Sequence, residues 1–256
     1  MDRNALNRKS GASAIDTAAV AALRQEVARR WRTADPLLPA PADSRLATAG
    51  EPPDGCDDPM IVPGPGGQPV AVGTCRHDRV PPDSMEILWG ASVRYVLSAQ
   101  VGGACAEEGL DRLLARWRAH LRSLPGTGAD TAATLTWPSR DISGVRALLG
   151  HGIEPLTVIA ARPAHRAVPP SRSGAKIRRA GPDDIAEILA LHMTEYRYDV
   201  HCGGAVQRPQ ASAVLRQEME RALRKPGGWR WLAEVERMVY RPLWTTWEAR
   251  PGGTLR

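Results

Sequence analysis

The chain has 256 residues, of which 43% are apolar, enough to bury one large core or two small ones. No apolar run reaches the ~18–20 residues that a membrane-spanning helix needs. Residues 1–15 carry charge but no apolar block, so the sequence shows no secretory signal. These features exclude an integral membrane protein and lead us to expect a cytoplasmic protein that makes no membrane contact.

The net charge of +6 lies in the C-terminal third. The chain has 34 basic and 28 acidic residues, and 16 of the basic and 10 of the acidic residues lie from Pro163 onward. The rest of the chain therefore has 18 basic and 18 acidic residues and is neutral. Such an excess can serve a nucleic acid or a phosphorylated ligand. Because no basic run or nucleic-acid motif accompanies it, we expect a solvated arginine-rich surface, with nucleic acid not among the main partners.

The four cysteines, at positions 56, 75, 105 and 202, include no C-x-x-C pair and no histidine at zinc-ligand spacing. We therefore expect reduced structural thiols and no metal site.

In chain order, residues 1–15 are expected to be disordered. The spacing of Val20, Leu23, Val27 and Trp31 predicts an amphipathic helix over residues 16–31, with Asp16 as its cap. Residues 33–59 are rich in proline, aspartate and glycine and indicate a long loop.

Two strands, at residues 60–62 and 69–76, flank the turn sequence GPGG and predict an antiparallel pair. Residues 78–84 are expected to form a loop. A third strand falls within residues 85–101, most securely over 93–101. A helix over residues 107–122 follows, and its apolar face is formed by Leu110, Leu113, Leu114, Trp117 and Leu121.

The clearest pattern runs from residue 129 to residue 163. Residues 131–137 predict a strand, Ser139 is placed to cap a helix, and Asp141 falls in its first turn. The apolar run at residues 156–161 predicts a buried strand. The apolar face of the helix is predicted to comprise Ile142, Val145, Leu148 and Leu149.

Residues 163–175 are typical of a linker. Beyond it, residues 176–179 are predicted to form a strand, and Pro182 to open a helix. A loop is predicted over residues 197–209, a second helix over residues 209–224, and a strand over residues 229–235. The last twenty or so residues show no settled pattern. A truncated or frame-shifted segment after about residue 235 is one interpretation of that loss.

This order of elements resembles the GNAT superfamily of acetyl-CoA-dependent N-acetyltransferases over residues 16–168. The segment SRDISGVRALLGHGIEPLTVIAARP is similar to the closing strand–helix–strand of the family, and IRRAGPDDIAEILAL resembles the start of a second GNAT domain. The resemblance implies an α/β fold in which helices flank a mixed central sheet. It also implies a partial second copy over residues 176–256.

The resemblance assigns a cofactor site as well. In the family, backbone N–H groups at the end of the third strand polarise the thioester, which places Ala99 and Val101 there. The loop that holds the pyrophosphate maps onto Gly109, Leu110 and Asp111. Ser139 falls where the pantetheine arm is contacted, with a plain helix cap as the alternative role.

Two departures weaken that assignment. Ala106 replaces the usual arginine, Glu107 replaces a glycine, and Asp111 replaces the last glycine or alanine. With Glu108, these acids face a position meant for a pyrophosphate, and each misplaced charge costs ~1–4 kcal/mol. Leu148 stands where many members have a general-acid tyrosine, so no catalytic residue is assigned.

Three functions stay open. By resemblance the chain is an acetyl-CoA-dependent N-acetyltransferase, of reduced or no activity, which would bind an acyl-CoA and an amine. The alternatives are an inactive GNAT-like scaffold that binds a partner, and a nucleic-acid-binding module in the basic C-terminal third. A homodimer is an open alternative to a monomer. An acceptor-side role for Tyr196, Tyr198, Asp199 and His201 is weighed against a packed loop.

Overall fold

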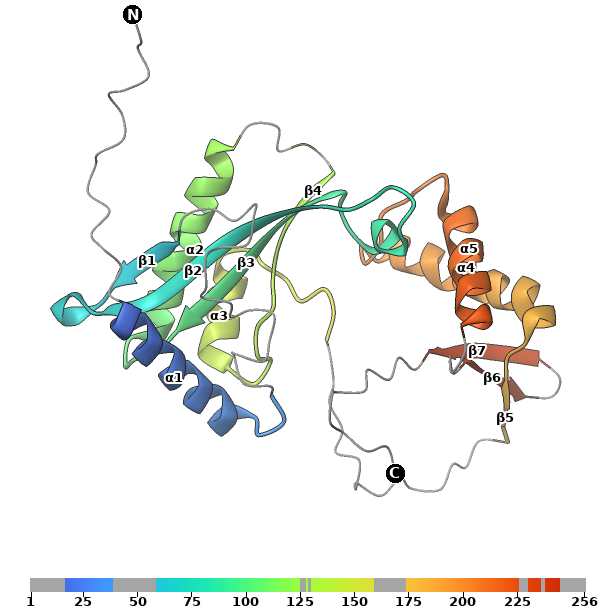
Figure 1. The fold of residues 1–256 in the computed structure, drawn as a ribbon, viewed down its shortest axis with the longest axis horizontal. Helices are drawn as coiled ribbons and strands as arrows, with labels where there is room; N and C mark the ends of the chain where they lie inside the picture. Colours follow the sequence, from blue (N-terminus) through green and yellow to red (C-terminus); the bar gives the residue numbers. More distant parts are fainter. Residues whose placement is uncertain are drawn as a thin grey trace, which may run out of the picture. The chain divides into compact units, whose positions relative to one another are not determined.

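The computed structural model describes residues 17–38, 59–124, 128, 130–158, 174–225, 230–235 and 238–244. The chain divides into two compact units (Figure 1). The first unit comprises residues 1–79 and 93–166, and the second comprises residues 80–92 and 167–256. The expectation for residues 1–15, and the proposed cap at Asp16, lie outside the described residues.

The first unit is built on a four-stranded mixed sheet in the order β1-β2-β3-β4. Strands β1 (Met60–Pro63), β2 (Pro69–Arg79) and β3 (Val93–Val101) are antiparallel neighbours, and β4 (Thr131–Leu135) runs parallel to β3. The predicted pairing across the GPGG turn is confirmed, and the turn requires glycine because Gly66 has a φ of 74°.

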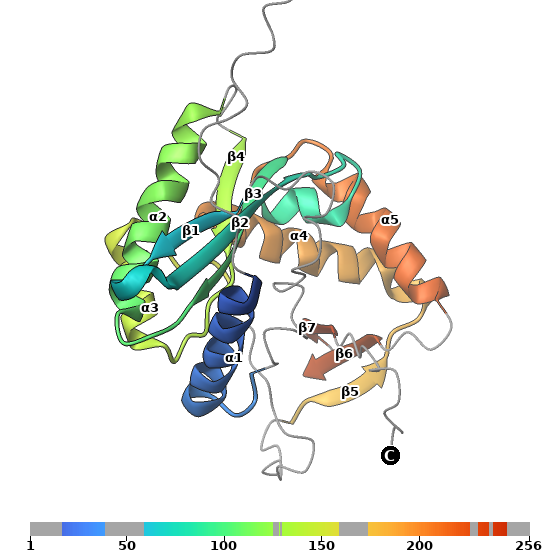
Figure 2. The same ribbon diagram turned by 60° about the vertical axis from the view of Figure 1, so that its left-hand side comes forward.

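Helices cover both faces of this sheet (Figure 2). Helix α1 (Thr17–Ala34) packs Leu23, Val27 and Trp31 against the face that carries Val72. Helices α2 (Ala106–Ser123) and α3 (Ile142–Gly150) pack on the opposite face. The alternation of side chains along β2 and β3 therefore serves two apolar layers, with one on each side of the sheet.

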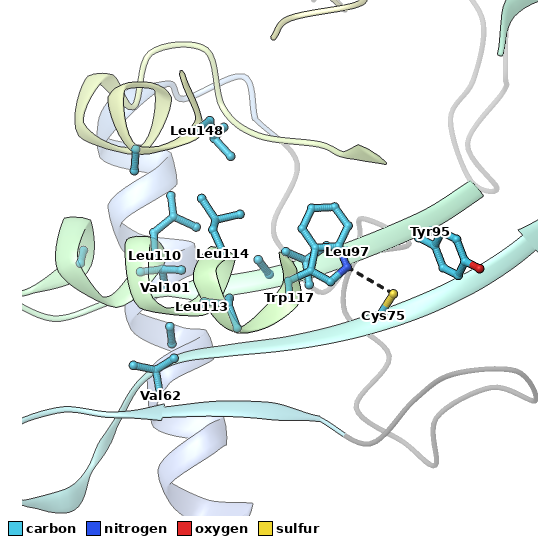
Figure 3. Close-up of a cluster of buried hydrophobic side chains, with 14 residues drawn as sticks. Val62, Cys75, Tyr95, Leu97, Val101, Leu110, Leu113, Leu114, Trp117 and Leu148 are labelled. Atoms are coloured by element: carbon cyan, nitrogen blue, oxygen red, sulfur yellow. Dashed lines mark hydrogen bonds between the residues drawn. The ribbon is translucent and has the colours of Figure 1, made fainter. Parts of the chain in front are cut away.

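The core between the sheet and α2 confirms the predicted helix face (Figure 3). Leu110, Leu113, Leu114 and Trp117 are each at most 1% exposed. The indole Nε1 of Trp117 donates to Sγ of Cys75 at 3.4 Å, so this buried polar group has a partner. Burial of each large side chain contributes about 1.5–3 kcal/mol.

The segment after β4 departs from the sequence expectations. Strand β4 ends at Leu135, and the N-cap of α3 is Asp141, whose carboxylate accepts from the Gly144 amide at 3.4 Å; Ser139 does not cap the helix. Ile142 and Leu149, predicted to face inward, are 73% and 52% exposed. Leu148 is buried as predicted, and Ala147, which was not predicted, joins it in the core beneath α2.

The buried strand predicted at residues 156–161 is wrong for its described part. Residues 156–158 form no strand, and Leu156 and Val158 are 62% and 72% exposed. Residues 159–161 lie outside the described part of the chain. An apolar run forms a buried strand only when a sheet edge receives it, and residues 156–158 pair with no described strand.

In its described residues, the second unit combines a three-stranded antiparallel sheet with two α-helices. Strands β5 (Lys176–Arg179), β6 (Arg230–Val235) and β7 (Met238–Trp244) lie in that order. Helix α4 (Ile185–His201) follows a short 3₁₀ turn over Pro182–Asp184, and α5 (Ala211–Arg224) follows α4. Strand β7 occupies sequence in which no pattern was recognised. A loop was predicted to begin at residue 197. Helix α4 continues to His201, so the loop begins five residues later.

Residues 80–92 belong to the second unit although they join β2 to β3 in the sequence. The third strand was predicted to lie within residues 85–101. Residues Met85–Trp89 form a 3₁₀ turn, and β3 starts at Val93. The expected single domain over residues 16–168 therefore contains a segment that packs elsewhere. Within the described residues, no helix is long and apolar enough to cross a membrane.

Candidate functional site

The C-terminal end of β3 is the candidate site, because β3 continues past its neighbour there. The pairing of β3 with β4 ends at Leu97 and Leu135. Gly102 donates its N–H to the Val70 carbonyl. The backbone N–H and C=O groups of Gly102 and of every second residue before it along β3 therefore point toward β2. The backbone groups of Ala99 and Val101 therefore point to the other side of β3, where β4 has ended.

An arginine from α1 occupies that side of the strand end. Nη1 of Arg30 donates to the Val101 carbonyl at 3.2 Å, and Nη2 lies 2.6 and 2.7 Å from the two carboxylate oxygens of Asp141. Asp141 is 7% exposed and also accepts from Trp137 Nε1 and Ser143 Oγ, each at 3.1 Å. The charge of this buried carboxylate is thus balanced by an arginine and hydrogen bonds.

A second side chain of α1 reaches the loop between β3 and α2. Gly103 has a φ of 80° and donates its N–H to Oε1 of Glu26 at 2.5 Å. A Cβ on Gly102 would lie 2.8 Å from Cδ1 of Leu23 and 3.1 Å from Oε2 of Glu26, so α1 presses directly on this loop. Loop amides that precede a helix attract anions, and here the anion is a carboxylate of the chain itself.

The acids of the first turns of α2 have structural partners. Glu107 lies 3.7 Å from Nη1 of Arg146 on α3, and Glu108 lies 4.0 Å from Nη1 of Arg112 one turn along α2. Both acids also favour the N-terminal end of the helix dipole. Ala106 is 9% exposed and belongs to the core, so an arginine at this position would have to leave the core to meet a ligand.

The other residues assigned to a cofactor loop are separated by the turns of α2. Gly109 faces β2, where a Cβ would lie 3.2 Å from Cγ2 of Val70, so close helix–sheet packing accounts for this glycine. Leu110 is 1% exposed in the core. Asp111 is at the surface, and its Oδ1 lies 2.8 Å from Nε2 of His151, the C-cap of α3.

The six predicted site residues therefore do not converge as side chains. Ala99, Val101 and Leu110 point into the core, Gly109 faces a neighbouring strand, and Asp111 and Ser139 lie at the surface. The sequence reasoning missed Glu26 and Arg30, which α1 directs at the strand end. Both positions flank the apolar stripe of α1, but the sequence gives no signal for the element that this stripe contacts.

A cavity of about 420 Å³ lies beside the first turn of α2, at the β1–β2 turn. Its lining is of mixed charge, and Nη1 of Arg112 is already bonded to the Pro63 carbonyl at 2.9 Å. The lining residues are Pro63, Gly64, Pro65, Val70, Cys105, Glu108, Gly109 and Arg112. None of the strand-end groups of Ala99 and Val101 contributes to it.

The tyrosines weighed for an acceptor role in the second unit differ in their burial. Tyr196 is 3% exposed, and its hydroxyl donates to the Val206 carbonyl at 2.6 Å and accepts from the Arg208 amide at 2.7 Å. Asp199 accepts from Nε1 of Trp89 at 3.1 Å, whereas Tyr198 is 67% exposed. Tyr196 and Asp199 thus hold the loop after α4 in place.

The described residues contain no group of three or more histidine, cysteine, aspartate or glutamate side chains placed to hold a metal ion. Comparison of the chain with family models, with curated proteins and with solved structures finds no match.

Proposed function

We propose that the chain is a GNAT-like protein whose first unit works as a partner-binding scaffold and does not transfer acetyl groups from acetyl-CoA. The order of helices and strands in the first unit, with β4 parallel to β3, supports the kinship. The contacts of α1 at the end of β3 support the loss of transfer.

The bond between Glu26 and the Gly103 amide carries this proposal. A diphosphate that approached the amides ahead of α2 would compete with Glu26 for the Gly103 N–H. It would approach three further acids, Glu107, Glu108 and Asp111, at a cost of ~1–4 kcal/mol for each poorly screened charge. The guanidinium of Arg30, at the end of β3, offers no free charge there because it is engaged by Asp141 and the Val101 carbonyl.

Isothermal titration with acetyl-CoA tests the proposal. The wild-type chain is expected to give no heat at millimolar cofactor. A variant that combines Glu26→Ala, Glu107→Gly and Asp111→Gly frees the loop amide and removes three charges, and it is expected to bind. Glu154→Ala is the matched control, since it removes an exposed acid of the first unit outside this loop.

The outcomes separate the hypotheses. Binding by the wild-type chain, followed by acetylation of an amine, overturns the scaffold and supports the N-acetyltransferase. Binding by the triple variant alone supports a decayed cofactor loop. If neither the wild-type chain nor the triple variant binds acetyl-CoA, the GNAT kinship loses its support and only the scaffold hypothesis is left. A cofactor loop freed of its acids should regain affinity for the diphosphate.

A further inference from the structure

Residues 80–92 supply core side chains to the second unit. Leu88 is fully buried, Ile87 is 2% exposed, and Val80 is 9% exposed. Met85 and Trp89 pack around the same cluster. The other buried members come from α4, α5, β6 and the residue that follows β5, namely Ala180, Ile188, Leu189, Tyr196, Ala211, Val214, Leu215, Met219 and Leu232.

The loop between α4 and α5 binds the backbone of this segment. The Val206 amide donates to the Leu88 carbonyl at 3.0 Å. Arg208 donates from Nε to the Ile87 carbonyl and from Nη2 to the Gly90 carbonyl, both at 3.2 Å. Three carbonyl groups within four residues are thus bonded by one loop, which gives these groups hydrogen-bond partners inside the second unit.

Tyr196 and Trp89 strengthen the same junction. Their rings meet edge to face with centroids 6.0 Å apart, and Trp89 is anchored by its bond to Asp199. The Tyr196 hydroxyl, bonded to Val206 and Arg208, fixes the loop that holds the segment. Side chains and loop are therefore organised around the presence of residues 80–92.

The two ends of the segment meet at one point. Val80 donates its N–H to the Ser92 carbonyl at 2.8 Å, in the same register as the pairs along β2 and β3. The ladder of β2 and β3 is therefore complete up to this pair, and the sheet of the first unit needs nothing from the residues between them.

We propose that the second unit is an acceptor for residues 80–92 and closes its core only when this segment is bound. The dependence runs one way: the first unit folds without the segment, and the second unit does not. The acceptor surface is formed by α4, α5 and the loop between them, and its occupant is the Met85–Trp89 turn with its flanking residues. This inference does not rest on the proposed function.

Replacement of residues 81–91 by Asn-Gly tests the dependence. A two-residue turn can join Val80 to Ser92 because these residues form a hydrogen-bonded pair. Hydrogen exchange followed by mass spectrometry is expected to show α2 protected to within about twofold of the wild-type chain, with α4 and α5 exchanging at least about tenfold faster. Protection of α4 and α5 in this variant, or its loss from α2, overturns the proposal.

Rescue in trans tests the acceptor surface itself. A synthetic peptide of residues 80–92 is expected to restore protection of α4 and α5 in the replaced variant, and a scrambled peptide is not. Failure of the native peptide to restore protection overturns the acceptor surface.

A point substitution makes the same test in the full chain. Leu88→Asp places a charge in the core of the second unit and is expected to unprotect α4 and α5 while α2 is unchanged. Asp83→Ala is the control, because it lies in the same segment and is exposed. Equal exchange in the two variants overturns the dependence.

Discussion

Arg30 on α1 and Asp141 at the start of α3 are 111 positions apart and meet through one guanidinium nitrogen at 2.6 and 2.7 Å. Through these two residues α1, the end of β3 and α3 share one polar junction, since Arg30 also binds the Val101 carbonyl. Asp141 is 7% exposed, whereas Arg30 keeps 26% of its side chain exposed. Removal of the carboxylate leaves a partly buried guanidinium without this counter-charge.

Asp141→Ala is expected to lower the free energy of unfolding of the first unit by about 3 kcal/mol, because it removes both the ion pair and the N-cap of α3. Asp141→Asn keeps a capping oxygen and is expected to cost less. Urea unfolding, read by hydrogen exchange in α3, measures both. Asp78→Ala is the control, since Asp78 pairs with Arg76 at the surface. A loss for Asp141→Ala no larger than the ~1 kcal/mol of the control contradicts this account.

Gly144→Ala is expected to destabilise α3 by about 2–3 kcal/mol, since overpacking forces neighbours to move. A Cβ there would lie 2.1 Å from Nε1 of Trp137 and 2.8 Å from Oδ2 of Asp141, so the indole must leave its carboxylate partner. Gly150→Ala, in the same helix, meets nothing within 4 Å. Thermal unfolding of the two variants should differ by several degrees, and equal melting temperatures would show that Trp137 relocates at no cost.

The sequence predicted those elements whose signal is local. The apolar stripe of α2 from Leu110 to Trp117 marks a helix whatever lies beneath it, because its period alone buries one face. The GPGG turn likewise predicted the pairing of β1 with β2. In both cases a short stretch carries the whole of the information that the structure uses.

The candidate site could not be predicted in the same way, because it depends on which elements meet. Glu26 and Arg30 acquire their partners only when α1 lies over the end of β3, and no pattern within α1 specifies that contact. The same limit explains residues 80–92, whose apolar core side chains Ile87 and Leu88 suit either unit. The strand prediction for residues 156–158 was wrong for the converse reason. Their apolar pattern is typical of a buried strand, but they pair with no strand in the described residues.

The second unit is expected to lose stability as the pH falls from about 6.5 toward 4. His192 is 3% exposed, and burial lowers the pKa of its imidazole to about 4. Between these values the unfolded chain binds a proton that the folded chain does not, so stability is complete above the unfolded pKa and declines below it. The full decline is about 3 kcal/mol.

Urea unfolding at pH 7.5 and pH 4.5, read by exchange in α4, measures this decline. His192→Gln is expected to flatten the pH dependence, and His201→Gln, at an exposed position, is expected to leave it unchanged. Glu195, whose Oε2 lies 3.3 Å from Nδ1 of His192, acts against the decline because it favours the charged ring. An unaltered pH dependence in His192→Gln would assign the decline to other groups.

The outer edge of β1 is expected to be kept from self-association by two arginines of α2. Nη1 of Arg112 donates to the Pro63 carbonyl at 2.9 Å, and Nη1 of Arg116 donates to the Ile61 carbonyl. β1 is an edge strand of its sheet. Because arginine side chains are bonded to its carbonyl groups, these groups are not available to pair with a strand of another molecule. Arg112→Ala with Arg116→Ala is therefore expected to raise the mass measured by sedimentation at high protein concentration.

The matched control for this edge is Arg118→Ala with Arg122→Ala, which removes the same charge from exposed positions of the same helix. If loss of net charge alone caused association, both double variants would sediment as larger species, since repulsion falls equally in each. Association confined to the Arg112 and Arg116 variant assigns the effect to the freed carbonyls of Ile61 and Pro63. Equal masses for the two variants would exclude a protective role for these bonds.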